Sequence, residues 1–208
     1  MATDTRDRLV TEALRLFSER GYAATSVAEL ERAAGLTPGA GGLYAHFTSK
    51  EELLAEAVER AAALTDVGYG MHAALDLGDL RSELTVVARG SFYLFDSMKD
   101  LLRLALREGD LHPTTFANAR DRLSGRAYRF LADLLQAKVD TGEMQEHDTN
   151  AVAGVLFGAI NNYWVQTVLY GWQPNDVNRD EFIAAWVDLA LRLAKTPRPA
   201  RRRRSPGR

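Results

Sequence analysis

Residues 33–50 read AAGLTPGAGGLYAHFTSK, and this stretch decides the fold. Just before it, Ser26 and Glu29 have the spacing of a capping box, which opens a short helix. Thr37 is then placed to cap a third helical element, with Pro38 in its first turn, where a missing N–H costs nothing. Helix, turn and short helix is the arrangement that places a second helix in the major groove of DNA.

Helical patterns continue on both sides of this stretch. Apolar residues recur at helical spacing over residues 9–17, and Ser49 with Glu52 forms a second capping box. The helix that it opens is expected to join two domains and to end at Gly68 and Gly70. Further helices are expected from Asp79, over 101–105, from Pro113 to Gly142, from Thr149 to Tyr170 and from Asp176 to about residue 194. No segment has the period of a strand, so the sequence predicts an all-α fold.

The stretch between residues 6 and 54 resembles the DNA-binding domain of the tetracycline-repressor (TetR) family of bacterial regulators. The residues that carry the resemblance are Ala13, Leu16, Phe17, Gly21, Tyr22, Thr25, Val27, Leu30, Ala34, Gly35, Leu43, Tyr44, His46, Phe47, Lys50, Leu53 and Leu54. Two features depart from the family pattern. Glu31 stands where a small helix-favouring residue is usual, and the stretch from Gly35 to Leu43 is two residues longer, with glycines at 39, 41 and 42.

The resemblance implies a division of the chain into a head and a regulatory body. Residues 1–50 are expected to form a three-helix, helix-turn-helix DNA-binding domain, and residues 51–196 a larger helical domain for effector binding and dimerisation. Residues 197–208, which are rich in arginine, are expected to be a disordered basic tail. The tail adds phosphate attraction, serves solubility or is a genomic accident, and the sequence leaves all three open.

Composition excludes several kinds of site. The 208 residues include no cysteine, so disulfides and thiolate metal sites are impossible, and the four histidines lie far apart. We therefore expect no metal and no cofactor. The N-terminus is charged rather than apolar, so no secretory signal is expected and the cytoplasm is the default location. Residues 195–208 carry a formal charge of +7 and the remainder −9, so attraction to DNA must be local to the motif or come from the tail.

The expected DNA contacts gather around the third element. They are Thr25, Ser26, Thr37, Pro38, Gly39, Ala40, Tyr44, His46 and Lys50. No Arg, Lys, Asn or Gln lies between Thr37 and Leu43, so base discrimination is expected to be modest, and the glycines predict a helix that is frayed without DNA. The alternatives are that Thr37 is only a cap, that the glycines form only a loop and that Lys50 is a solvated charge.

Two further surfaces are expected in the regulatory domain. An effector pocket is predicted from aromatic and adaptable side chains, namely Phe92, Phe95, Met98, Phe116, Tyr128 and Asn162. A dimer interface is predicted from apolar stripes on the last two helices, namely Trp164, Val168, Phe182, Trp186, Leu189 and Leu193. These stripes can also pack entirely within one chain. Residues 151–172 carry no formal charge, so a membrane span is a weaker alternative for them.

The function predicted from these patterns is regulation of transcription, not catalysis. The resemblance implies a repressor that binds a palindromic operator as a homodimer and is released by a small hydrophobic effector. No paired carboxylates or nucleophile with a base occur at interpretable spacing. The competing class is a helical carrier of lipid-like molecules, but a carrier has no reason to hold a capped helix-turn-helix. The sequence leaves open the operator, the effector, the regulated genes and the sign of regulation.

Overall fold

The computed structural model describes residues 4–63 and 77–193, and these residues form helices and turns without a β-strand. The helices are α1 (Thr5–Arg20), α2 (Val27–Ala33), α3 (Lys50–Ala63), α5 (Leu80–Ser97), α6 (Lys99–Glu108), α7 (Pro113–Arg120), α8 (Arg126–Asp140), α9 (Thr149–Trp164) and α10 (Arg179–Leu191). The all-α prediction is therefore confirmed. Among the described residues, no helix is both long and apolar enough to cross a membrane.

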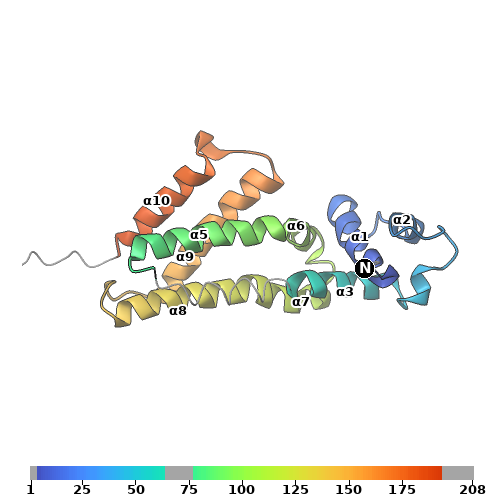
Figure 1. Cartoon of the computed structure of the whole chain (residues 1–208), viewed down its shortest axis with the longest axis horizontal. Helices are drawn as coiled ribbons and strands as arrows, with labels where there is room; N and C mark the ends of the chain where they lie inside the picture. The colour runs from blue at the N-terminus through green and yellow to red at the C-terminus, as the bar shows by residue number, and fades with distance from the viewer. Residues whose placement is uncertain (1–3, 64–76, 194–208) are drawn as a thin grey trace, which may run out of the picture.

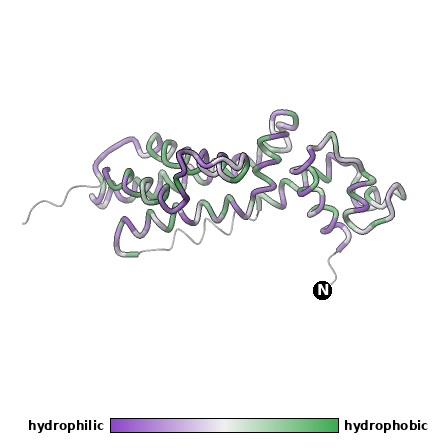
Figure 2. The backbone as a smooth tube through the Cα atoms, turned by 90° about the horizontal axis from the view of Figure 1, so that it is seen from above, coloured by the Kyte–Doolittle hydropathy of each residue, from purple (hydrophilic) through white to green (hydrophobic). Residues whose placement is uncertain are grey.

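The helices are arranged as a small head at one end of an elongated body (Figure 1). The head consists of α1, α2 and the first part of α3, and its core includes Phe17, Leu30, Phe47 and Leu53, which are almost completely buried. In the body, α9 packs against α8 and α5, α10 packs against α5, and α6 lies between α5 and the head, where it packs against α1. Figure 2 shows apolar and polar residues alternating along these helices, as amphipathic helices require.

Most predicted helix boundaries agree with the structure. The long helix expected from Pro113 is α7 and α8 joined by one π-helical turn at Asp121–Gly125, and α9 likewise continues as a π-helical turn at Val165–Leu169. The predicted start of the last helix at Asp176 is wrong. Asp176 has a φ of +56°, outside the helical region, and Asn178 caps α10 with a capping box instead.

Two sequence predictions lie outside the described residues. They are the end of the inter-domain helix at Gly68 and Gly70, and the basic tail at 197–208. The last helix is expected to end near residue 194, but α10 ends earlier, at Leu191. Helix α3 is described from Lys50 as far as Ala63.

Candidate DNA interface, effector pocket and dimer surface

The first two helices of the head meet as the sequence predicts. The Glu29 N–H donates to Ser26 Oγ at 3.3 Å and the Ser26 N–H donates to the Glu29 carboxylate at 2.8 Å, which completes the capping box. Beyond α2, Gly35 has a φ of +77°, where a side chain would be strained. The chain therefore turns sharply after α2, as a helix-turn-helix requires.

The third element differs from the prediction, because Thr37 does not cap an α-helix. Residues 36–42 form successive turns, and only Leu43–Ala45 adopts a short 3₁₀ helix. Gly39 and Gly41 have φ values of +78° and +77°, which a right-handed helix cannot contain. The two extra residues of this stretch are thus accommodated as a loop, which we call the glycine loop (residues 36–42).

A buried carboxylate holds the glycine loop in place. The Glu31 side chain is fully buried, and its two oxygens accept the Gly39 N–H at 2.6 Å and the Leu43 N–H at 3.1 Å. The pKa of Glu31 lies below its ordinary value because the backbone N–H groups of Leu43 and Gly39 stabilise the charged form, although burial opposes this effect. The carboxylate is therefore ionised at neutral pH.

Most of the predicted DNA contacts are exposed or half-buried in the head. Thr37, Pro38, Gly39 and Ala40 are exposed, Tyr44 is 57% exposed, Ser26 is exposed and His46 is half-buried. Thr25 is the exception. It is fully buried, and its hydroxyl donates to the Gly21 carbonyl at 2.8 Å, so it holds the turn after α1 and has no access to a phosphate.

Lys50 also faces inward in this structure. Its ammonium donates to the Tyr22 carbonyl and lies 4.2 Å from the centre of the Tyr22 ring. Partial burial lowers the pKa of Lys50, while the nearby Glu108 carboxylate opposes that shift. A phosphate contact would require this side chain to leave the contacts that it makes here.

Tyr22 connects the head to helix α6 of the body. Its N–H donates to the buried Glu108 carboxylate at 2.9 Å, and its ring meets the His112 ring edge-on at 4.7 Å between centroids. Two further bonds join the same elements, from Arg107 to the Glu19 carbonyl at 3.1 Å and from Ser18 Oγ to Asp100 at 3.1 Å. We call this set of contacts the head–body junction.

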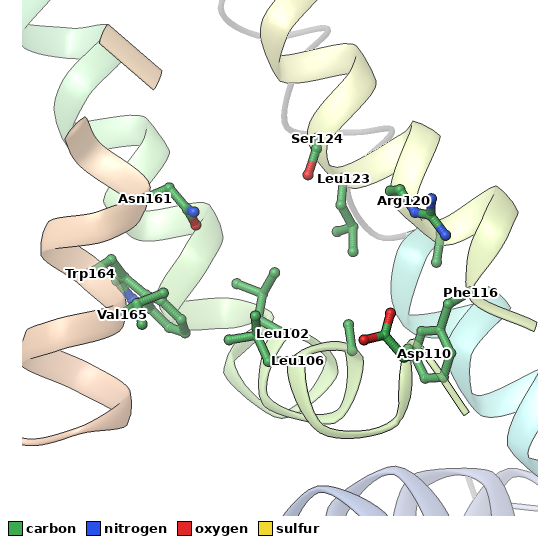
Figure 3. Close-up of a pocket in the computed structure, with 13 residues that line it drawn as sticks. Leu102, Leu106, Asp110, Phe116, Arg120, Leu123, Ser124, Asn161, Trp164 and Val165 are labelled. Atoms are coloured by element: carbon green, nitrogen blue, oxygen red, sulfur yellow. The ribbon is translucent and has the colours of Figure 1, made fainter. Parts of the chain in front are cut away.

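The opposite side of α6 borders a cavity of about 290 Å³ in the body (Figure 3). Most of the side chains around it are apolar, and they come from α6, α7, the π-helical turn after it and α9. The cavity-lining residues are Leu102, Ala105, Leu106, Gly109, Asp110, Phe116, Ala119, Arg120, Leu123, Ser124, Asn161, Trp164 and Val165. We call this cavity the effector pocket, after the role that we propose for it below.

Few of the residues predicted to bind an effector line this cavity. Of them only Phe116 does, and Asn161, which is exposed like its neighbour Asn162, provides the amide. Phe92, Phe95 and Met98 are buried in the core of the body, where they fill space between helices. Tyr128, on α8, packs its ring against Phe157 at 4.6 Å between centroids.

Polar side chains in the pocket come from Arg120, Asp110, Ser124 and Asn161, and polar atoms make up almost half of the exposed wall. Trp164 presents its ring to the cavity, and its indole N–H donates to Asp96 at 2.8 Å. A cavity lined by apolar side chains and a few polar ones is the usual form of a small-molecule site. Among the described residues, no cluster of three or more side chains suited to a metal ion occurs.

A largely apolar surface extends over α9 and α10. It is lined by Ala151, Val152, Val155, Leu156, Leu189, Ala190, Arg192 and Leu193. We call it the dimer surface, after the role that we propose for it. Val155 is 67% exposed and Leu189 is 54% exposed, which is unusual for side chains so close together. The predicted Leu189 and Leu193 are part of this surface.

The other predicted interface residues lie elsewhere. Trp164 and Trp186 are buried within one chain, and the Trp186 indole donates to the Leu156 carbonyl at 2.9 Å. Phe182 stacks on Tyr163 at 4.3 Å between centroids, and Val168 is half-buried against the core of the body. Large aromatic residues thus form the monomer's core here, and smaller aliphatic residues form the exposed face.

A helix-turn-helix head tied to a helical body with a cavity beside the connecting helix defines a class, the one-component DNA-binding regulators. Residues 9–57 match the family described as "Bacterial regulatory proteins, tetR family", and residues 82–193 match "AefR-like transcriptional repressor, C-terminal domain". The second match alone covers more than half of the chain. The protein therefore belongs to the TetR family of bacterial regulators.

Individual relatives agree with this assignment. The regulator AcrR of Shigella flexneri is 46% identical over 55 residues, which cover 26% of this chain and 25% of AcrR. The chain thus matches only about a quarter or less of the length of its curated relatives.

Solved structures are similar over almost the whole chain. A regulator from Saccharomonospora viridis in complex with choline has a TM-score of 0.70 and 21% identity, over 88% of this chain and 94% of that one. AibR in complex with isovaleryl coenzyme A and operator DNA has a TM-score of 0.66 and 21% identity, over 89% and 97% of the two chains. At this level of identity, the likeness shows the fold.

Proposed function

We propose that this protein is a homodimeric transcriptional repressor that binds a palindromic operator and is released by a small-molecule effector. The observation that carries the proposal is the double role of α6. Leu102, Ala105 and Leu106 on one side of this helix line the effector pocket, while Arg107 and Glu108 on the other side bind the head. A ligand in the pocket therefore contacts the same rigid element that positions the DNA-binding motif.

The proposed mechanism is a shift between two arrangements of the dimer. In one arrangement the two heads fit half-sites that lie roughly 34 Å apart, or a multiple of that distance. In the other arrangement, α6 moves with the head–body junction and the spacing no longer fits. An effector shifts this equilibrium only if it binds the second arrangement more tightly. Such a role requires DNA, and we accordingly place the protein in the bacterial cytoplasm and assign it no catalytic activity.

Similar proteins support both halves of the proposal. The AibR structure holds an acyl coenzyme A and operator DNA in one complex, and the S. viridis regulator holds choline. In this chain, the exposed residues around the glycine loop supply hydroxyl and backbone groups for phosphate and base contacts. We retain Ser26, Thr37, Pro38, Gly39, Ala40, Tyr44 and His46 as the proposed DNA contacts.

The direct test is unbiased selection of bound DNA by the purified full-length chain, followed by titration of the selected duplex. We expect enrichment of a sequence with two-fold symmetry and dissociation of the complex by a compound that also binds the free protein. A chain that binds small apolar ligands but selects no sequence, even at low salt, would be a carrier and would contradict the proposal.

The pocket suggests an effector with an apolar body and an anionic group. Within the described part of the chain, Arg120 forms no ion pair, and the other charged side chain among the pocket-lining residues is Asp110. A guanidinium in this setting binds a carboxylate through two parallel hydrogen bonds. Asn161 and Ser124 add neutral donors and acceptors on the same cavity.

Replacing Arg120 with glutamine is expected to weaken binding of such a ligand. Because charge-assisted hydrogen bonds contribute about 1.5–3 kcal/mol each, we expect a loss of roughly tenfold to hundredfold in affinity. The measurement is a thermal-shift titration with straight-chain carboxylates of medium length and the corresponding alcohols. The matched control is Arg89→Gln, which removes an arginine from the outside of α5. Equal responses of the two variants to every carboxylate would contradict the assignment.

A further inference from the structure

The two departures from the family pattern meet at one place in the structure. Glu31 replaces a small residue on α2, and the glycine loop adds two residues several positions later. The Glu31 carboxylate reaches across the turn and accepts N–H bonds from Gly39, in the middle of that loop, and from Leu43, just after it. The two changes therefore form a single hydrogen-bonded unit.

A buried carboxylate is costly unless hydrogen bonds compensate for lost water. Here the compensation comes from backbone N–H groups that a regular helix would have used internally. Gly39 and Gly41 have positive φ, but a Cβ at either position would meet no atom within 4 Å. Glycine is thus required at these positions by the backbone conformation, since a larger side chain would find room there. In this conformation the Gly39 N–H points toward Glu31.

We infer that Glu31 is a positioning residue, which fixes the glycine loop as a preformed DNA-reading element in place of a recognition helix. The inference rests on the proposed DNA-binding function. The Glu31 side chain itself is too deeply buried to contact DNA, but Thr37, Pro38 and Ala40 on the loop are exposed. Sequence preference should therefore depend on a residue that contacts no base.

The charge of Glu31 allows its positioning role to be tested. Removing an acidic side chain from a DNA-binding domain should raise the affinity for DNA, because it removes a charge that repels phosphates. Removing a carboxylate that positions the DNA-reading loop should instead lower the affinity for the selected operator. Glu51 provides a matched control, since it is an exposed glutamate in the first turn of α3. Glu31→Gln and Glu51→Gln change the net charge of the head equally.

The experiment compares the two variants with the wild-type full-length chain on the selected operator and on a random duplex. Both oxygens of Glu31 accept N–H bonds, and a glutamine has only one oxygen to offer. We expect Glu31→Gln to lose about tenfold in operator affinity, with random-duplex binding unchanged or slightly stronger. Glu51→Gln should retain the wild-type ratio between the two affinities. A global folding defect would instead lower both affinities of the Glu31 variant.

Two further measurements do not depend on that comparison. In the DNA-free protein, hydrogen exchange at Gly39 and Leu43 should be slow in the wild type and faster in Glu31→Gln, with exchange in α1 unchanged. Combining Glu31→Ala with deletion of Gly41 and Gly42 restores the family pattern, and we expect this variant to bind DNA with a different selected sequence.

The outcomes separate this inference from the proposed function. A wild-type chain that selects no DNA overturns the function itself. A wild-type chain that selects an operator, with Glu31→Gln matching Glu51→Gln in affinity, specificity ratio and exchange, overturns the inference and leaves the function intact.

Discussion

Replacing both Val155 and Leu189 with glutamate is expected to convert a dimer into a monomer and to abolish tight operator binding. Both side chains are more than half exposed in one chain, on an apolar surface built by α9 and α10. In a two-fold interface, each substitution acts twice and places charges in apolar surroundings without partners. A monomer presents only one head to a palindrome. The gain from linking two binding sites is typically 10²–10⁴-fold, so we expect operator affinity to fall by about a hundredfold or more.

Sedimentation equilibrium and a mobility-shift titration measure the two halves of this prediction. The control is Thr114→Glu combined with Asn118→Glu, at two exposed positions one turn apart on α7. It adds the same negative charge, so it reports any general repulsion of DNA. If the Val155 and Leu189 variant remained dimeric, this surface would not be the interface.

Replacing Glu108 with alanine is expected to disconnect the effector pocket from the DNA-binding head. Glu108 is buried and accepts the Tyr22 N–H at 2.9 Å, and its loss leaves that donor without its partner. An unsatisfied buried donor costs about 1–3 kcal/mol, which should appear as a lower free energy of unfolding in urea. The effector should still bind, because Glu108 does not line the pocket.

The specific effect of this substitution concerns coupling. In the wild type, effector and operator should weaken each other's binding by the same factor, typically 5–150-fold. We expect Glu108→Ala to reduce that factor several-fold, measured in both directions with a ligand that the carboxylate titration identifies. Glu146→Ala, which removes an exposed glutamate from the loop before α9, is the control. An unchanged coupling factor in the Glu108 variant would mean that the signal takes another route.

The local features of the head could be predicted from the sequence because they depend on neighbouring residues. The Ser26–Glu29 capping box and the left-handed Gly35 are short-range patterns, and both are present. The Ser49 cap is also present, although the Glu52 carboxylate bonds to Thr48 and not to the Ser49 backbone. Helix boundaries in the body agree for the same reason.

The third element could not be predicted correctly, since its conformation depends on a distant side chain. Propensity alone suggested a weak helix opened by Thr37 and frayed by its glycines. In the structure, the Glu31 carboxylate binds the backbone at Gly39 and Leu43, so the stretch is a defined loop. The unusual glutamate and the extra glycines were both visible in the sequence, but their contact was not.

The residues of the effector pocket and of the dimer surface also could not be predicted from the sequence. Aromatic residues were expected to line both, yet Phe92, Phe95 and Trp186 fill the core, where their large apolar area is best buried. No sequence pattern marks Arg120 as a pocket residue or Val155 as a surface residue, because a single arginine or valine within a helix forms no motif.

The order of amino acids by itself determined the helices, their caps and the helix-turn-helix family to which this chain belongs, because those properties arise within a few residues of each other. The packing of α6 between pocket and head, the capture of the glycine loop by Glu31 and the exposure of Val155 were decided only by tertiary structure. Each of them joins residues distant in the chain, and such contacts depend on how whole helices pack.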